Sequence, residues 1–97
     1  MLLLTAIDAG ALHGYAIAEE LRRASAGRLD LQDGTIYPAL RRLERAGWVS
    51  STWDQDTGRR RRSYHLTPDG RSTLRDKRGD WTQFARVVTD VLDLRPQ

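Results

Sequence analysis

The stretch DGTIYPALRRLER combines a hydroxyl-rich, aromatic turn with an arginine-rich continuation. Thr35 and Tyr37 carry hydroxyl groups beside Pro38, and Arg41 and Arg42 follow one helical turn later. The free backbone N–H groups at the start of a helix suit phosphate oxygens. Arginine adds planar, bidentate contacts with phosphate and with guanine edges. These residue types at this spacing predict a surface that binds the phosphates and bases of DNA.

Each of these side chains can be given a role on duplex DNA. In a helix-turn-helix the second helix enters the major groove with its N-terminus first. We therefore expect Thr35 and Arg41 to hydrogen-bond base edges, and Pro38 to make an apolar contact there. The phosphate contacts are assigned to the side chains of Tyr15, Tyr37 and Arg42. The alternative for the helix arginines is a solvated face.

A second basic cluster, RRRR at residues 59–62, follows the turn-forming segment QDTG. The flanking segments WVSSTW and RRRRSYHLT are rich in strand formers, which predicts a β-hairpin. The arginines expected to reach the DNA backbone or the minor groove are Arg59, Arg60 and Arg61. A solvated position is the alternative for each arginine of the run, so the prediction is that at least two of the four make contact.

The distribution of charge is more informative than its total. The chain of 97 residues has a net charge of +3 and a pI near 9.9, and 15 of its 16 basic residues are arginine. A GC-rich genome also favours arginine codons, but it does not explain why arginines cluster at 41–45 and 59–62. Clustered arginine therefore indicates a nucleic-acid partner.

Other chemistries find little support in the sequence. The absence of cysteine excludes a disulfide framework, a cysteine zinc site and a cysteine nucleophile. His13 and His65 have no ligand-spaced partners, and the pattern Asp54-x-Asp56-x-Gly58 lacks the closing glutamate of a calcium loop. No catalytic triad, phosphate-cradling glycine loop or pair of catalytic carboxylates stands out. We therefore expect no enzyme, no metal and no cofactor.

The start of the chain bears on where the protein is found. The opening MLLLTAI is apolar, but it lacks a basic beginning and is too short to span a bilayer. We therefore expect a soluble, cytoplasmic protein with no membrane partner. A single domain of this size buries only a modest fraction of its surface, so an oligomer interface would stabilise it.

The elements that must position these side chains indicate a mainly α fold with a small β-hairpin. The pattern predicts helices at 2–9 and 15–25, a third helix over the stretch quoted first, the hairpin, and a last helix at about 68–93. Two linked helices followed by a hairpin make a winged helix-turn-helix. We expect residues 1–67 to bind DNA and residues 68–97 to form a dimerisation helix, within one structural unit.

The second helix has one apolar side and one charged side. Its inward positions are Ile17, Ala18, Leu21 and Ala24. On the outer side Glu19 precedes Arg22, and Glu20 precedes Arg23, by three residues. Such i,i+3 pairs stabilise a helix by a few tenths of a kcal/mol each.

The start of the third helix leaves two caps open. If Thr35 is the N-cap, Pro38 falls at the third helical position, where its missing N–H would be free in any case. If Asp33 is the N-cap, one hydrogen bond is lost and the first turn must loosen. Because Tyr37 precedes a proline and resists the α conformation, we expect an irregular first turn.

The last helix should begin with Thr67 as its N-cap and Pro68 as its first helical residue. Its apolar stripe is too broad for so small a core, which calls for a partner, most simply a second copy of the chain. The expected dimer interface comprises Leu3, Leu74, Trp81, Phe84, Val88 and Val91. Gly79 and Asp80 interrupt the pattern, so we expect a bend there.

Four segments occur in a specific order: HGYAIAEEL at 13–21, DGTIYPALRRLERAGWV at 33–49, RRSYHLTPDG at 61–70, and the lone Trp81. Together they resemble the PadR family of bacterial winged-helix transcriptional regulators, in its small subgroup with a short C-terminus. The resemblance spans nearly the whole chain. It implies a homodimer joined through its last helices, repression relieved by small ligands, and inverted-repeat operators. Relatives usually carry more residues before the leucine-rich start, so either the start lies upstream or the first helix is trimmed.

Trp81 has two interpretations, and the whole chain has three. Trp81 packs in the dimer interface or, as the resemblance implies, stacks on a flat aromatic or hydrophobic ligand, with Phe84 and Val88 lining the same cavity. For the chain, the alternatives to a dimeric repressor are a winged-helix protein-interaction module and a ligand-binding dimer with incidental DNA affinity. The RRRR run and the Tyr-Pro turn disfavour the first alternative, and the clustering of arginine disfavours the second.

Overall fold

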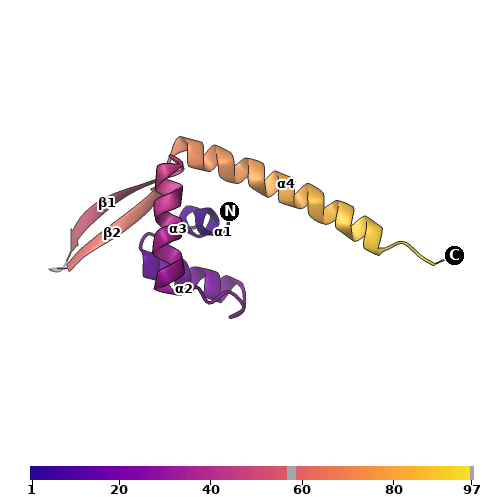
Figure 1. Ribbon diagram of the computed structural model, residues 1–97, viewed down its shortest axis with the longest axis horizontal. Helices are drawn as coiled ribbons and strands as arrows, with labels where there is room; N and C mark the ends of the chain where they lie inside the picture. Colours follow the sequence, from indigo (N-terminus) through magenta and orange to yellow (C-terminus); the bar gives the residue numbers. More distant parts are fainter. Residues whose placement is uncertain (57–58, 97) are drawn as a thin grey trace.

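The computed structural model describes residues 1–56 and 59–96 of the chain. Its elements are α1 (Leu2–Asp8), α2 (Gly14–Ala24), α3 (Asp33–Arg45), β1 (Val49–Asp56), β2 (Arg59–Leu66) and α4 (Pro68–Leu92). In Figure 1 the first three helices form a body, the hairpin projects from one side, and α4 leaves on the other. The predicted mainly helical fold with a small hairpin is confirmed. The predicted turn QDTG and the calcium-like pattern both include Gly58, which lies outside the described residues.

The core lies where the three helices, the root of the hairpin and the start of α4 meet. Its most completely buried side chains are Leu4, Ile17, Ile36 and Leu40. Around them pack Ile7, Leu21, Val49, Tyr64, Leu66 and Leu74. Ala18 is half-buried, whereas Ala24, which was predicted to face inward, is exposed. Ala24 is the last residue of α2 and lies beyond the edge of this core.

The third helix starts earlier than either predicted cap allows. Gln32 is its N-cap residue, and its carbonyl accepts hydrogen bonds from the N–H groups of Thr35 and Ile36 at 2.8 and 3.0 Å. The predictions of Asp33 or Thr35 as the N-cap are therefore wrong. Pro38 lies at the sixth helical position rather than the third, inside the helix.

Tertiary packing explains why α3 continues through Pro38. A proline inside a helix removes one hydrogen bond, here the one to the Gly34 carbonyl, and costs about 3 kcal/mol. Ile36 and Leu40, on either side of the proline, are 1% and 0% exposed. Burying two aliphatic side chains contributes about 1.5–3 kcal/mol each, which is enough to offset this cost.

The hairpin is the wing of the fold, and its root is anchored to the body. Its two strands pair antiparallel, with Val49 opposite Leu66 at the root. The N–H of Tyr64 donates to the carbonyl of Leu12 at 2.8 Å, so the link between α1 and α2 runs along β2. The wing therefore leaves the body from a fixed base.

The fourth helix begins with the predicted cap. Thr67 Oγ1 accepts the Gly70 N–H at 3.0 Å, and Pro68 is the first helical residue. The Thr67 N–H donates to the Trp48 carbonyl at 3.1 Å, and its hydroxyl donates to the Gly47 carbonyl at 2.6 Å. A Cβ atom added to Gly70 would lie 1.9 Å from the Trp48 oxygen. These contacts join the start of α4 directly to the segment that follows α3.

Beyond this start, α4 continues unbroken to Leu92, and Figure 1 shows it as one straight rod. The predicted bend at Gly79 and Asp80 is therefore wrong. A glycine inside a helix costs only about 0.5–1 kcal/mol relative to alanine, too little to end a helix that continues on both sides. Leu74 is buried in the core of its own chain, whereas Trp81 and the apolar residues after it are exposed.

Candidate nucleic-acid interface

A groove opens between the start of α2, the outer side of α3 and the hairpin, and we call it the wing groove. Its volume is about 760 Å³. Its aromatic lining comes from Tyr15, Tyr37, Trp53 and Tyr64. Its charged lining comes from Arg41, Glu44, Arg45, Arg61 and Arg62. Guanidinium groups beside aromatic rings on one concave surface are suited to phosphate, sugar and base.

The wing groove brings together residues that lie far apart in the sequence. Tyr15, in the first turn of α2, is 75% exposed, and Tyr37, from α3, is 40% exposed. Arg41 lies one turn further along α3, and Arg61 reaches the groove from β2. Four of the nine predicted DNA-binding residues thus share one surface.

The other five predicted residues lie elsewhere. Thr35 and Arg42 are exposed on α3, outside the lining of the wing groove, and Pro38 is half-buried there. Arg59 and Arg60 belong to β2, but their side chains lie outside the part of the chain that the structure describes.

Tyr37 owes its place to a glycine on the neighbouring helix. A Cβ atom added to Gly14 would lie 2.8 Å from the Tyr37 ring and from its hydroxyl. The ring therefore lies directly on the backbone at the start of α2, so Tyr15 and Tyr37, the two exposed tyrosines of the groove, lie next to the same helix end. The sequence HGY, which carries both Gly14 and Tyr15, is explained by this close approach.

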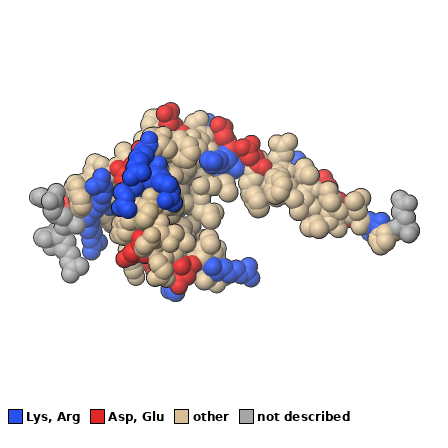
Figure 2. Space-filling view, in the orientation of Figure 1, with Lys and Arg blue, Asp and Glu red and all other residues tan. Residues whose placement is uncertain are grey.

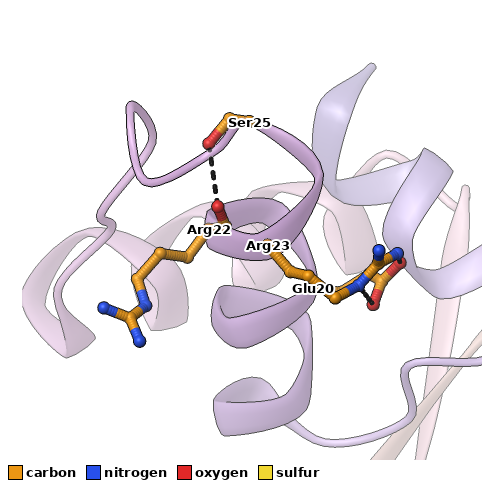
Figure 3. Close-up of polar contacts among 4 residues, drawn as sticks. All are labelled: Glu20, Arg22, Arg23 and Ser25. Atoms are coloured by element: carbon orange, nitrogen blue, oxygen red, sulfur yellow. Dashed lines mark hydrogen bonds and ion pairs between the residues drawn. The ribbon is translucent and has the colours of Figure 1, made fainter.

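The arginines of α2 are neutralised by their neighbours. Both predicted pairs are present, with nitrogen–oxygen distances of 2.5 Å for Arg23–Glu20 and 3.7 Å for Arg22–Glu19. Figure 3 shows Arg23 beside Glu20, with the Arg22 side chain pointing away from both. The hydroxyl of Ser25 donates to the Arg22 carbonyl at 3.2 Å. The hydrogen bond from Arg23 lowers the pKa of Glu20 and raises that of Arg23.

The arginines that face the wing groove are mostly uncompensated. Arg41, Arg45 and Arg61 form no ion pair with the side chains that the structure describes, those of residues 1–54 and 61–96, and neither does Arg42. Figure 2 shows basic side chains gathered over α3 and the hairpin. Positive charge without a protein partner therefore concentrates where the predicted DNA-binding residues meet.

Sequence reasoning missed a set of residues that face α3 from the hairpin. Trp53 and Arg62 are cross-strand partners in the register, and the guanidinium of Arg62 lies 5.1 Å from the centroid of the Trp53 ring. Ser51 lies two residues before Trp53, on the same side of β1, and bonds to Glu44 of α3. The alternation of side chains in the hairpin could have separated Arg62 from its neighbours.

Tyr64 closes the inner end of the wing groove. Its side chain is nearly completely buried. Burial raises the pKa of the Tyr64 hydroxyl above its ordinary value, and the negative charge of Glu44 acts in the same direction. The phenol is therefore a neutral group at the base of a positively charged surface.

The described residues offer no cluster of three or more acidic, histidine or cysteine side chains that could hold a metal ion. The ring of His13, one of the two histidines, lies with Nδ1 3.2 Å from the carbonyl of Arg62, where it links the start of α2 to the wing. Among the helices described, none is long and apolar enough to cross a membrane.

Known proteins resemble this chain in sequence and in fold. A family model described as the transcriptional regulator PadR-like family matches residues 3–76. Transcriptional regulator Rv3488 of Mycobacterium tuberculosis is 38% identical over 77 residues, which are 79% of this chain and 69% of that protein. A PadR family transcription regulator from Clostridium difficile R20291 matches with a TM-score of 0.81 at 31% identity, covering 94% of each chain. A transcriptional regulator from Clostridium thermocellum matches with a TM-score of 0.82 at 27% identity, covering 92% of this chain and 84% of that one.

Proposed function

Because this chain belongs to the PadR-like family of transcriptional regulators, which are not enzymes, we propose that it is a dimeric repressor of an inverted-repeat operator. In this proposal residues 1–67 bind DNA, residues 68–97 join two copies, and a small aromatic or hydrophobic ligand releases the operator. The observation that carries the proposal is the wing groove, in which unpaired arginines of α3 and β2 meet two exposed tyrosines.

The reading of DNA follows from the position of α3. Its N-terminus leaves the N–H groups of Asp33 and Gly34 without helical partners, and these favour a phosphate oxygen. With this end in the major groove, Thr35 and Arg41 reach base edges and Pro38 makes an apolar contact. The phosphate contacts come from Tyr15, Tyr37 and Arg42, and from the wing arginines Arg59, Arg60 and Arg61.

The exposed part of α4 supports a second copy of the chain as the partner. Its large apolar side chains are uncovered, among them Trp81, Phe84, Val87, Val91 and Leu92. An apolar surface of this extent on a small protein indicates a protein interface. In a two-fold dimer formed by two such helices, we expect the two α3 helices to bind half-sites about 34 Å apart, one turn of the double helix.

A planar effector would bind on the same helix. The ring centroids of Trp81 and Phe84 are 5.9 Å apart with an angle of 44° between the planes, and Val88 follows one turn later. Pure packing between subunits is the alternative role for Trp81. Titration of flat aromatic compounds into wild type and Trp81→Ala separates the two. Equal affinity for every compound that binds would leave Trp81 with packing alone.

Selection from random duplex DNA at about 150 mM salt tests the proposed function. We expect an enriched inverted repeat, bound with a steep salt dependence, because each phosphate contact adds about −0.9 to the slope of log affinity against log salt. Replacing Arg41 by alanine should weaken binding about 5- to 150-fold for each half-site, the effect of losing one bidentate base contact in each copy of the chain. A matched control is Arg75→Ala, an exposed arginine on α4.

The outcome separates DNA reading from its rival. A well-formed dimer that enriches no duplex, and binds DNA with a shallow salt dependence, would favour a winged helix that binds another protein. Equal losses for Arg41→Ala and Arg75→Ala would show that charge alone, and not the position of α3, governs binding.

A further inference from the structure

Glu44 carries a negative charge on the surface that we propose binds phosphates. It lies on α3, three residues after Arg41, and lines the wing groove with its side chain 25% exposed. A carboxylate this close to DNA repels the phosphates, so its presence costs affinity unless it contributes something else. Its contacts indicate what that contribution is.

Three side chains connect α3 to both strands of the wing. The Ser51 hydroxyl of β1 donates to Glu44 Oε2 at 2.9 Å. The Arg62 Nε of β2 donates to the Ser51 hydroxyl at 2.8 Å, and its Nη2 lies 3.5 Å from the same carboxylate oxygen. Glu44, Ser51 and Arg62 thus form a closed set, which we call the wing brace.

Arg62 is held on further sides. Its guanidinium lies against the Trp53 ring, and its carbonyl oxygen lies 3.2 Å from His13 Nδ1. Of the arginines in the RRRR run whose side chains the structure describes, Arg62 is bound by the protein and Arg61 has no ion pair. Arg61 and Arg62 therefore differ in their roles, although both are arginines and adjacent in the sequence.

We propose that Glu44 and Arg62 are positioning residues that brace the wing against α3, so that Glu44 strengthens DNA binding in spite of its charge. A two-stranded hairpin is only marginally stable alone. An unbraced wing would lose conformational freedom when it meets DNA, and that loss weakens affinity. The brace fixes the wing before binding and sets the spacing between the bases read by α3 and the backbone reached by Arg61. The proposal rests on DNA binding as the function.

Two substitutions at one position distinguish the brace from simple electrostatics. Glu44→Gln and Glu44→Ala remove the same charge, but glutamine still accepts a hydrogen bond from Ser51 and alanine does not. Alanine is the best helix former, so α3 should tolerate it. We expect operator affinity to fall from wild type to Glu44→Gln to Glu44→Ala, with a loss of about three- to tenfold for alanine. If charge alone matters, both variants bind equally, and more tightly than wild type.

Arg62→Gln, alone and combined with Glu44→Ala, completes a double-mutant cycle for the two residues. In the brace, Glu44→Ala combined with Arg62→Gln is no weaker than the weaker single variant, because the same connection is lost. If Arg62 instead contacts a phosphate, its loss reduces the magnitude of the salt slope by about 0.9 for each copy of the chain and adds fully to the effect at Glu44, which overturns the proposal. The matched control is Glu19→Gln on α2, which removes an equal charge from an exposed ion pair outside the wing groove.

A measurement without DNA keeps the brace testable independently. We expect amide hydrogen exchange in β1 and β2 to become several-fold faster in Glu44→Ala, while the amides of α2 keep their wild-type rates. Unchanged exchange in the wing would contradict the brace. If wild type enriches no operator but the exchange of the wing responds as expected, the proposed function fails and the brace stands.

Discussion

At the scale of single residues, neighbours decide what an arginine can do. Arg23 is paired with Glu20 on its own helix, and Arg62 contacts Ser51 and Glu44 on two other elements. Arg41 has no acidic partner among the residues described and faces the groove. An arginine cluster in a sequence therefore identifies candidates for DNA contact. Only the surrounding structure shows which arginines are free to bind DNA and which are bound within the protein.

The pKa of Tyr64 predicts how stability changes in alkaline solution. Its hydroxyl has a pKa raised by burial, so the folded chain holds the phenol proton at pH values where the unfolded chain has lost it. The stabilisation is complete below about pH 10, the ordinary tyrosine pKa, and is lost as pH rises through the raised pKa. We expect the free energy of unfolding in urea to fall more steeply above about pH 10 for wild type than for Tyr64→Phe. Parallel curves for the two proteins would mean that this phenol has the same pKa in both states.

Part of the site could be predicted from local sequence, and part could not. Tyr15, Tyr37, Arg41 and Arg61 were each assigned to DNA, and the groove does bring them together. The brace was missed because it depends on which residue of one element faces which residue of another. Glu44 reads as an ordinary helix glutamate until the strand register places Ser51 and Arg62 beside it.

At the scale of elements, the sequence predicts a helix start correctly where neighbouring residues alone determine it. The start of α4 at Thr67 and Pro68 follows from side-chain capping and from the fixed φ of proline. The start of α3 was misplaced because the burial of Ile36 and Leu40 carries the helix through Pro38. The bend at Gly79 is predicted from the low helix propensity of glycine, but this cost is too small to interrupt a helix that continues on both sides.

Two glycines of α4 give a matched prediction. Gly70→Ala should destabilise the protein by about 1–3 kcal/mol, because the new Cβ would overlap the Trp48 carbonyl and force the start of α4 away. Gly79→Ala, with nothing within 4 Å of its Cβ, should stabilise the helix by about 0.5–1 kcal/mol. Urea unfolding of both variants is the measurement. Similar changes for the two would contradict the close contact at Gly70.

At the scale of the whole molecule, the structure is elongated, and the apolar side chains of its outer helix are exposed. Its principal extents are 67 × 29 × 20 Å, and the outer part of α4 accounts for the elongation seen in Figure 1. The core is confined to the body, while Trp81 and Phe84 are 56% and 58% exposed. An apolar surface exposed in this way supports the proposed pairing of two chains along α4.

A single charge on this helix tests the proposed dimer. Phe84→Glu places a carboxylate in the apolar stripe, where dimerisation would bury it at high cost, so we expect a monomer in sedimentation velocity. Operator affinity should fall with it, because one chain contacts only one half-site. The control is Gln83→Glu, the same charge on the adjacent exposed position. If Phe84→Glu sediments as the wild type does, the stripe does not join the copies.

Because α4 is attached beside Trp48, it acts as a lever whose fixed end lies next to the C-terminal end of α3. Thr67 and Gly70 fix the pivot, and Leu74 is buried beside it. The 18 residues from Arg75 to Leu92 extend about 27 Å beyond the core at 1.5 Å per residue. A tilt of about 5° at the pivot displaces the far end of such a rod by roughly 2 Å. Small displacements between two such levers in a dimer would therefore change the relative orientation of two distant reading helices.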